Sequence, residues 1–165
     1  PAMRQTDVSI FPTRTVYSFE EAGVRLTLTF LTPLLPSELE LISRPVTYLT
    51  WEVESIDGTV HEVSLYYDNT AELVVNTADQ HVVASRYRLD SLLVLSMGSQ
   101  DQEVLKKSGD DLRIDWGYLH VGIPRQYASA DLIAGHTRSR KAFAERGTLP
   151  VPFPLRRAPS LQAMA

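Results

Sequence analysis

The sequence predicts a mainly β protein, namely an antiparallel β-sandwich with one C-terminal helix and an extended, proline-rich arm. Two observations carry this prediction. Apolar and polar residues alternate with a period of two in many short segments, which is typical of strands with one buried face. From Leu132 onward, apolar residues recur at helical spacing instead, and Gly147 can end that helix. At least eight strands separated by turn residues favour a sandwich or a barrel.

The first two strands are expected over 15–19 and 24–30, where every second residue is apolar. A polar loop at 20–23 joins them with a consistent parity, so that their apolar residues share one face. Two prolines then interrupt the sheet. Residues 36–42 can form a single helical turn before the next strand.

The segment 44–69 predicts a long hairpin around an Asp-Gly turn. A three-residue loop at 56–58 would place Trp51 opposite Val63, which keeps the apolar residues of both strands on one face. We expect these strands to supply much of the core. The expected core residues are Leu26, Leu28, Phe30, Leu49, Trp51, Val53, Val63 and Leu65.

Further apolar segments at 73–75, 81–83 and 92–97 predict three more strands. A polar loop is expected over 99–111 because this stretch is rich in charged and small residues. The alternation then returns at 112–118 and predicts another strand.

Three regions follow from these patterns. Residues 1–128 are expected to form the sandwich, and 129–147 a helix that starts at Ser129 as its N-cap. Residues 148–165 contain three prolines at alternate positions, which cannot donate a full ladder of hydrogen bonds. This segment is therefore expected to be an extended linker or arm that leads toward a further domain.

Composition excludes several functions. The chain has 165 residues, a net charge of −4 and no cysteine, so it has no disulfide, cysteine nucleophile or thiolate metal site. No apolar run approaches the roughly 20 residues of a transmembrane helix. Residues 132–165 carry six Lys or Arg and one acidic residue. We expect this basic region to be solvated or to dock on an acidic domain, and we expect neither nucleic acid nor membrane as a partner.

No residue pattern predicts a catalytic site, a cofactor or a metal. None of the four histidines lies two to four residues from another, so no local pair of metal ligands exists, although a site assembled across strands stays open. His61 is expected opposite Val53 near the end of the hairpin, where it can bond a loop carbonyl.

The run 115–118, Asp-Trp-Gly-Tyr, could bind a sugar or an amine through ring stacking and a carboxylate. Strand parity instead predicts that both aromatic residues lie in the core and that the aspartate points outward. The remaining alternative is a surface that meets a further domain or its ligand. The candidate residues of such a ligand or interdomain surface are Asp115, Trp116, Tyr118, His61 and Tyr66.

Several short pieces of the chain also occur in a characteristic order. These pieces are PTRTVY at 12–17, LTF at 28–30, PLLP at 33–36, SRPVTYL at 43–49, SIDG at 55–58, His61, YYD at 66–68 and DWGY at 115–118. Together they resemble the N-terminal region of the glutaminase A family of fungi and gut bacteria.

The resemblance implies a non-catalytic β-sandwich that precedes a larger, all-helical toroidal domain of the same polypeptide, where the active site would lie. It implies that the whole protein hydrolyses L-glutamine to L-glutamate and ammonia, and that it acts outside the cytoplasm. The alternative is a carbohydrate-binding or sandwich domain of a glycoside hydrolase. The observation that discriminates this alternative is whether Tyr48, Tyr66, Tyr87 or Tyr118 forms a flat, exposed row. A third hypothesis is a small, free-standing hydrolase built on the sandwich.

Overall fold

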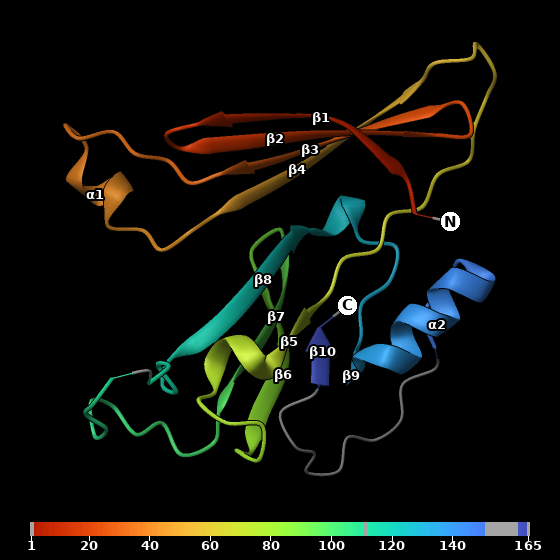
Figure 1. Cartoon of the computed structure of the whole chain (residues 1–165). Helices are drawn as coiled ribbons and strands as arrows, with labels where there is room; N and C mark the ends of the chain where they lie inside the picture. The colour runs from red at the N-terminus through yellow and green to blue at the C-terminus, as the bar shows by residue number, and fades with distance from the viewer. Residues whose placement is uncertain (1, 111, 151–161, 165) are drawn as a thin grey trace. The chain divides into compact units, whose positions relative to one another are not determined.

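The computed structural model describes residues 2–110, 112–150 and 162–164. These residues are mainly β, with antiparallel strands and one longer helix (Figure 1). The chain divides into two compact units, residues 1–63 and 64–165, which are described separately below. No helix in the described part of the chain is long and apolar enough to cross a membrane.

The elements follow one another along the chain. They are β1 (Arg4–Phe11), β2 (Arg14–Glu21), β3 (Val24–Leu31), α1 (Leu39–Ile42), β4 (Tyr48–Ser55), β5 (Asn69–Thr70), the 3-10 turn η1 (Ala71–Val74), β6 (Val82–Leu89), β7 (Leu92–Ser99), β8 (Tyr118–Pro124), the 3-10 turn η2 (Arg125–Tyr127), β9 (Ile133–Gly135), α2 (His136–Arg146) and β10 (Gln162–Met164).

Unit 1 is a four-stranded antiparallel sheet in the order β1-β2-β3-β4, shown in red to yellow in Figure 1. The register places Leu28 between Tyr17 and Trp51, so the apolar residues of neighbouring strands share one face. This confirms the strands predicted at 15–19 and 24–30 and the first strand of the predicted hairpin. The apolar face carries Val8, Ile10, Tyr17, Phe19, Leu26, Leu28, Phe30, Leu49, Trp51 and Val53.

The core prediction for this unit is only partly correct. The six predicted core residues of β3 and β4 do share a face, but none is fully buried, and Phe30 and Val53 are exposed. The predicted second strand of the hairpin does not form. Residues 59–68 are not in a strand, β4 pairs with β3 alone, and Val63 and Leu65 are exposed.

Local hydrogen bonds explain why the chain leaves the sheet here. The Asp57 carboxylate accepts the backbone N–H of Thr59 at 2.9 Å and its hydroxyl at 2.8 Å, as in an Asx-turn. The Ile56 N–H donates to the carbonyl of Gly23 at 2.8 Å, which binds the tip to the β2–β3 turn. These bonds compete with the ladder that would continue the hairpin.

Gly23 lies directly against this tip and gives a first testable prediction. Its φ is +81°, and an added Cβ would lie 2.0 Å from the Asp57 carboxylate. Gly58 has a similar φ of +75° but nothing within 4 Å of the added Cβ. We expect Gly23→Ala to destabilise the chain more than Gly58→Ala, which carries only the backbone strain of about 1–2 kcal/mol. Denaturant unfolding of both variants checks this, and equal losses would contradict it.

Unit 2 is built on the three-stranded sheet β6-β7-β8 and the small sheet β5-β10-β9. The central strand β7 is buried along nearly its whole length, which confirms the strand predicted at 92–97. β6 confirms most of the segment at 81–83. Residues 73 and 74 lie in η1 and Val75 is the extended residue that follows it, so 73–75 is not a strand. The core cluster consists of Ala71, Val74, Leu95 and Met97, with Val82, Ala84, Leu119, Val121 and Ile133 packed against it.

The strand predicted at 112–118 is wrong except for its last residue, since β8 begins at Tyr118. The expected orientation is reversed as well, because Leu112 and Ile114 are exposed whereas Asp115 is buried. Two features account for this. Polar partners hold the Asp115 side chain inside the protein. Gly117 has a φ of +86°, which interrupts the extended backbone and the alternation of side chains that the prediction assumed.

The C-terminal helix is shorter than predicted. α2 begins at His136, and Ser129 does not cap it, because residues 133–135 pair with β10 as strand β9. Gly147 ends the helix as predicted, with a φ of 66° and its N–H donating to the carbonyl of Phe143 at 2.7 Å. Most of the arm expected at 148–165 lies outside the described residues. Its described end, Gln162–Met164, forms β10 between β5 and β9.

Candidate functional site

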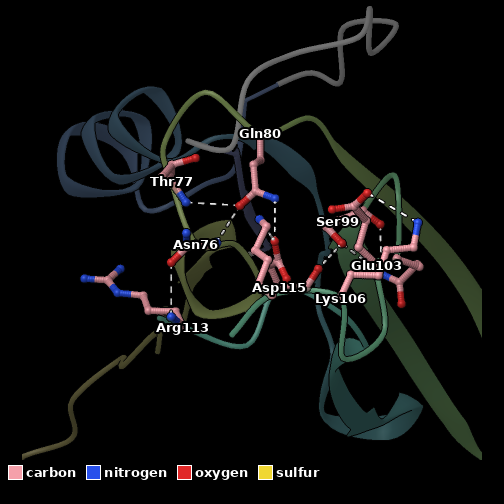
Figure 2. Close-up of polar contacts among 10 residues, drawn as sticks. Asn76, Thr77, Gln80, Ser99, Glu103, Lys106, Arg113 and Asp115 are labelled. Atoms are coloured by element: carbon pink, nitrogen blue, oxygen red, sulfur yellow. Dashed lines mark hydrogen bonds and ion pairs between the residues drawn. The ribbon is translucent and has the colours of Figure 1, made fainter. Parts of the chain in front are cut away.

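The most enclosed charged group in the described residues is the Asp115 carboxylate, whose side chain is 4% exposed (Figure 2). One oxygen, Oδ2, accepts the Gln80 Nε2–H at 2.8 Å and also the Lys107 ammonium. Gln80 precedes β6, and Lys107 belongs to the loop after β7. The site is therefore assembled from three loops at one end of the sheet.

The electrostatics of this pair favour the ionised form. The Lys107 ammonium, and then the Gln80 amide, hold the pKa of Asp115 below its usual range. The same pair raises the pKa of Lys107. Asp115 therefore stays ionised at neutral pH and is a poor proton acceptor, which suits a structural role better than general base catalysis.

The side chains of Gln80 and Asn76 make further hydrogen bonds to the backbone. The Gln80 Oε1 accepts the N–H groups of Asn76 at 2.6 Å and Thr77 at 3.0 Å (Figure 2). The Asn76 Oδ1 in turn accepts the backbone N–H of Arg113 at 3.1 Å. This chain of bonds fixes the turn before β6 to the loop before β8.

A second set of bonds fixes the start of β8. The Gly117 N–H donates to Gln102 Oε1 at 2.7 Å, and Gln102 Nε2 donates to the carbonyls of Ser99 at 2.8 Å and Gly117 at 3.1 Å. The Ser99 hydroxyl donates to the carbonyl of Asp115. In the described residues, no buried side-chain nitrogen or oxygen lacks a partner. The cluster is a network of hydrogen bonds that joins the loops before β6, after β7 and before β8.

The other predicted residues of this motif lie differently from expectation. Trp116 is half-buried, but Tyr118 is 52% exposed on β8, so its prediction as a core residue is wrong. Asp115, which was expected to point outward, is the buried member. The sequence could not show this, because the partners of Asp115 come from loops 8 and 35 residues away.

His61 lies in unit 1 and contacts the hairpin tip. Its Nε2 is 2.9 Å from the Asp57 carboxylate and 3.0 Å from the Thr59 hydroxyl, so its partners are side chains and not the predicted loop carbonyl. The hydrogen bond from His61 is the main reason that the pKa of Asp57 lies far below its usual range. This arrangement stabilises the turn.

Tyr66 belongs to a different cluster, in unit 2. Its hydroxyl donates to Asp68 Oδ2 at 2.9 Å, and its ring stacks on Phe143 of α2 with centroids 5.0 Å apart. Arg140 of α2 donates to both Asp68 oxygens, at 2.6 and 2.7 Å. The Asp68 side chain is only 6% exposed. Sequence reasoning missed Asp68 and Arg140, since no local spacing connects residues 72 positions apart.

His61 belongs to unit 1 and the other four candidate residues to unit 2. Within unit 2, no hydrogen bond, ion pair or ring contact among the described residues joins Tyr66 to Asp115, Trp116 or Tyr118. No group of three or more His, Cys, Asp or Glu in the described part of the chain could hold a metal ion. In the described residues, the polar clusters around Asp115 and Asp68 support loops and a helix.

The described residues thus form a mainly β protein in which polar clusters fix loops and a helix. Comparison with known proteins identifies the family. The chain belongs to the family described as "Domain of unknown function (DUF5127)", which matches residues 13–154.

The chain is also similar to Glutaminase A of Aspergillus oryzae (strain ATCC 42149 / RIB 40). The two are 32% identical over 151 residues, which cover 90% of this chain and 22% of that protein. The chain therefore spans about a fifth of the length of this relative. This similarity supports, at the level of the family, the resemblance seen in the sequence. No solved structure matches the chain.

Proposed function

We propose that this chain is the N-terminal β-sandwich accessory domain of a glutaminase A-like amidohydrolase. One observation carries the proposal: the similarity to Glutaminase A extends over 90% of this chain but only 22% of the relative. Most of the relative's length has no counterpart here. The chain would provide scaffold and interface, while a helical domain of the same polypeptide would hydrolyse L-glutamine.

The geometry supports a non-catalytic role. A hydrolase of this kind needs an activated nucleophile or water, a base and donors for the developing oxyanion. The best enclosed carboxylate, Asp115, is held ionised by Lys107 and Gln80, and its other neighbours bond one another. Asp68 is likewise engaged by Tyr66 and Arg140.

The purified chain is therefore expected to release no ammonia from L-glutamine above the rate of a protein-free control. A coupled assay with glutamate dehydrogenase measures this release directly. Asp115→Asn and Asp68→Asn serve as matched variants. Ammonia release by the chain that either single substitution abolishes would contradict the accessory role.

We also propose that the protein is located outside the cytoplasm, as the resemblance to glutaminase A implies. Fractionation of the source cells, followed by immunoblotting against this chain, tests this location. We expect the signal in the exported fraction, and a signal confined to the cytosol would contradict it.

A further inference from the structure

One face of the β6-β7-β8 sheet carries an aromatic surface that the accessory role does not use. Tyr118 begins β8 and is paired with Gly98 of β7. A Cβ added to Gly98 would lie 2.6 Å from the Cδ1 atom of Tyr118, so the phenol ring lies directly on the glycine backbone. The ring is nevertheless 52% exposed. One side of the ring is thus held by the sheet, and the ring stays accessible to solvent.

Two further rings continue this surface. His120 lies two residues along β8 on the same face, with its ring 6.2 Å from that of Tyr118 and tilted by 31°. Tyr87 of β6 stands nearly perpendicular to His120 at 6.4 Å, and its hydroxyl lies 3.3 Å from His120 Nδ1. The result is not a flat row of three rings. The rings of Tyr118 and His120 are tilted only slightly from each other, and the Tyr87 ring stands nearly perpendicular to His120 at the edge of the surface.

The small residues of β7 permit this arrangement. Ser96 is paired with His120, and Gly98 with Tyr118, so the rings lie over short side chains and cover the central strand. Covering a glycine with a neighbouring aromatic ring is a common device in sheets. That device explains why Tyr118 lies on Gly98, but it does not require two more aromatic rings beside it.

The lack of charged side chains on this face of the sheet indicates which class of ligand it could bind. It carries no Asp, Glu, Lys or Arg, and its only titratable side chains are the three rings themselves. Its residues are Val83, Ser85, Tyr87, Leu89, Leu92, Val94, Ser96, Gly98, Tyr118, His120, Gly122 and Pro124. A charged ligand would find no opposite charge here. An apolar protein segment would bury the Tyr118 hydroxyl and His120 Nε2, which have no partner in the described part of the chain.

We propose that the surface formed by Tyr118, His120 and Tyr87 binds the pyranose ring of a neutral carbohydrate. The apolar C–H face of the sugar would stack on the Tyr118 ring, and its hydroxyls would bond Tyr118, His120 Nε2 and Tyr87. Both kinds of contact are available at once only for a ligand with one apolar face and polar edges. This inference does not depend on the proposed function as an accessory domain, since it concerns a ligand of the β6-β7-β8 sheet itself.

The test is isothermal titration of the purified 165-residue chain with three neutral probes: cellohexaose, xylohexaose and mannohexaose. At least one probe is expected to bind. Tyr118→Leu removes the stacking ring while keeping an apolar cover over Gly98, and it should weaken binding by about tenfold or more. Tyr118→Phe keeps the ring and should retain most of the affinity.

Tyr48→Leu is the matched control, since Tyr48 is 50% exposed but makes no ring contact among the described residues. It should bind as the parent chain does. If Tyr118→Leu does not fold, NMR titration of the parent chain replaces it, and shifts should centre on the amides of Ser96, Gly98 and Tyr118. Three outcomes would overturn the proposal: no binding of any probe at millimolar concentration, equal affinity in the folded Tyr118→Leu variant, or a dimer that this substitution dissolves.

Discussion

Met97→Ala is expected to lower the free energy of unfolding by about 2–5 kcal/mol. Met97 is completely buried in β7, where it packs with Leu95, Val74 and Ala71. Replacing its side chain removes apolar contacts and leaves a cavity that the neighbouring strands can close only in part. Urea unfolding monitored by circular dichroism measures the loss.

Leu73→Ala is the control for this prediction. Leu73 belongs to η1 in the same unit but is exposed, so its truncation should change the stability by less than about 0.5 kcal/mol. Similar losses for Met97→Ala and Leu73→Ala would show that the core of unit 2 lies elsewhere.

Asp68→Ala is expected to lower the free energy of unfolding by roughly 1–3 kcal/mol at neutral pH. The substitution leaves the Tyr66 hydroxyl and the Arg140 guanidinium without their shared acceptor. The loss should stay below that of a fully buried ion pair, because Arg140 is itself partly exposed to water. Glu145→Ala on the same helix, whose contact with Lys141 is 3.8 Å long, should have little effect.

The contribution of Asp68 should also depend on pH. The hydrogen bonds from Arg140, and after them the one from Tyr66, hold the pKa of Asp68 below its ordinary value of 3.8. A carboxyl with a lowered folded-state pKa stabilises the fold above its unfolded pKa, and this contribution is lost as the pH falls through the folded pKa. The stability difference between the parent chain and Asp68→Asn should therefore shrink below pH 3.8. A difference that grows on acidification would contradict the ion pair.

The sequence predicted the elements whose apolar residues alternate without interruption. β2, β3, β4 and β7 follow from period-two patterns, and the register that places Trp51 beside Leu28 agrees with the predicted shared face. β1 was missed because its first half is polar and obscures the alternation of Val8 and Ile10. Periodicity detects a strand only where one face is consistently apolar.

The failures have a common physical cause, namely polar groups that satisfy the backbone differently from a regular ladder. Asp57 turns the chain at the expected hairpin, and Asp115 is pulled inward by Lys107 and Gln80. In both places the alternation of residues suggested a strand, but side-chain hydrogen bonds determined the path. Partners from distant loops cannot be recognised from local spacing, so the candidate site was located only in part.

The proposed role as an accessory domain is tested most directly by one comparison of ammonia release from L-glutamine. The 165-residue chain is compared with Glutaminase A of Aspergillus oryzae at equal molar concentration. We expect Glutaminase A to release ammonia and this chain to release none, because the enclosed carboxylates Asp115 and Asp68 are held ionised by Lys107 and Arg140. Release by this chain at a rate comparable to that of Glutaminase A would contradict the account.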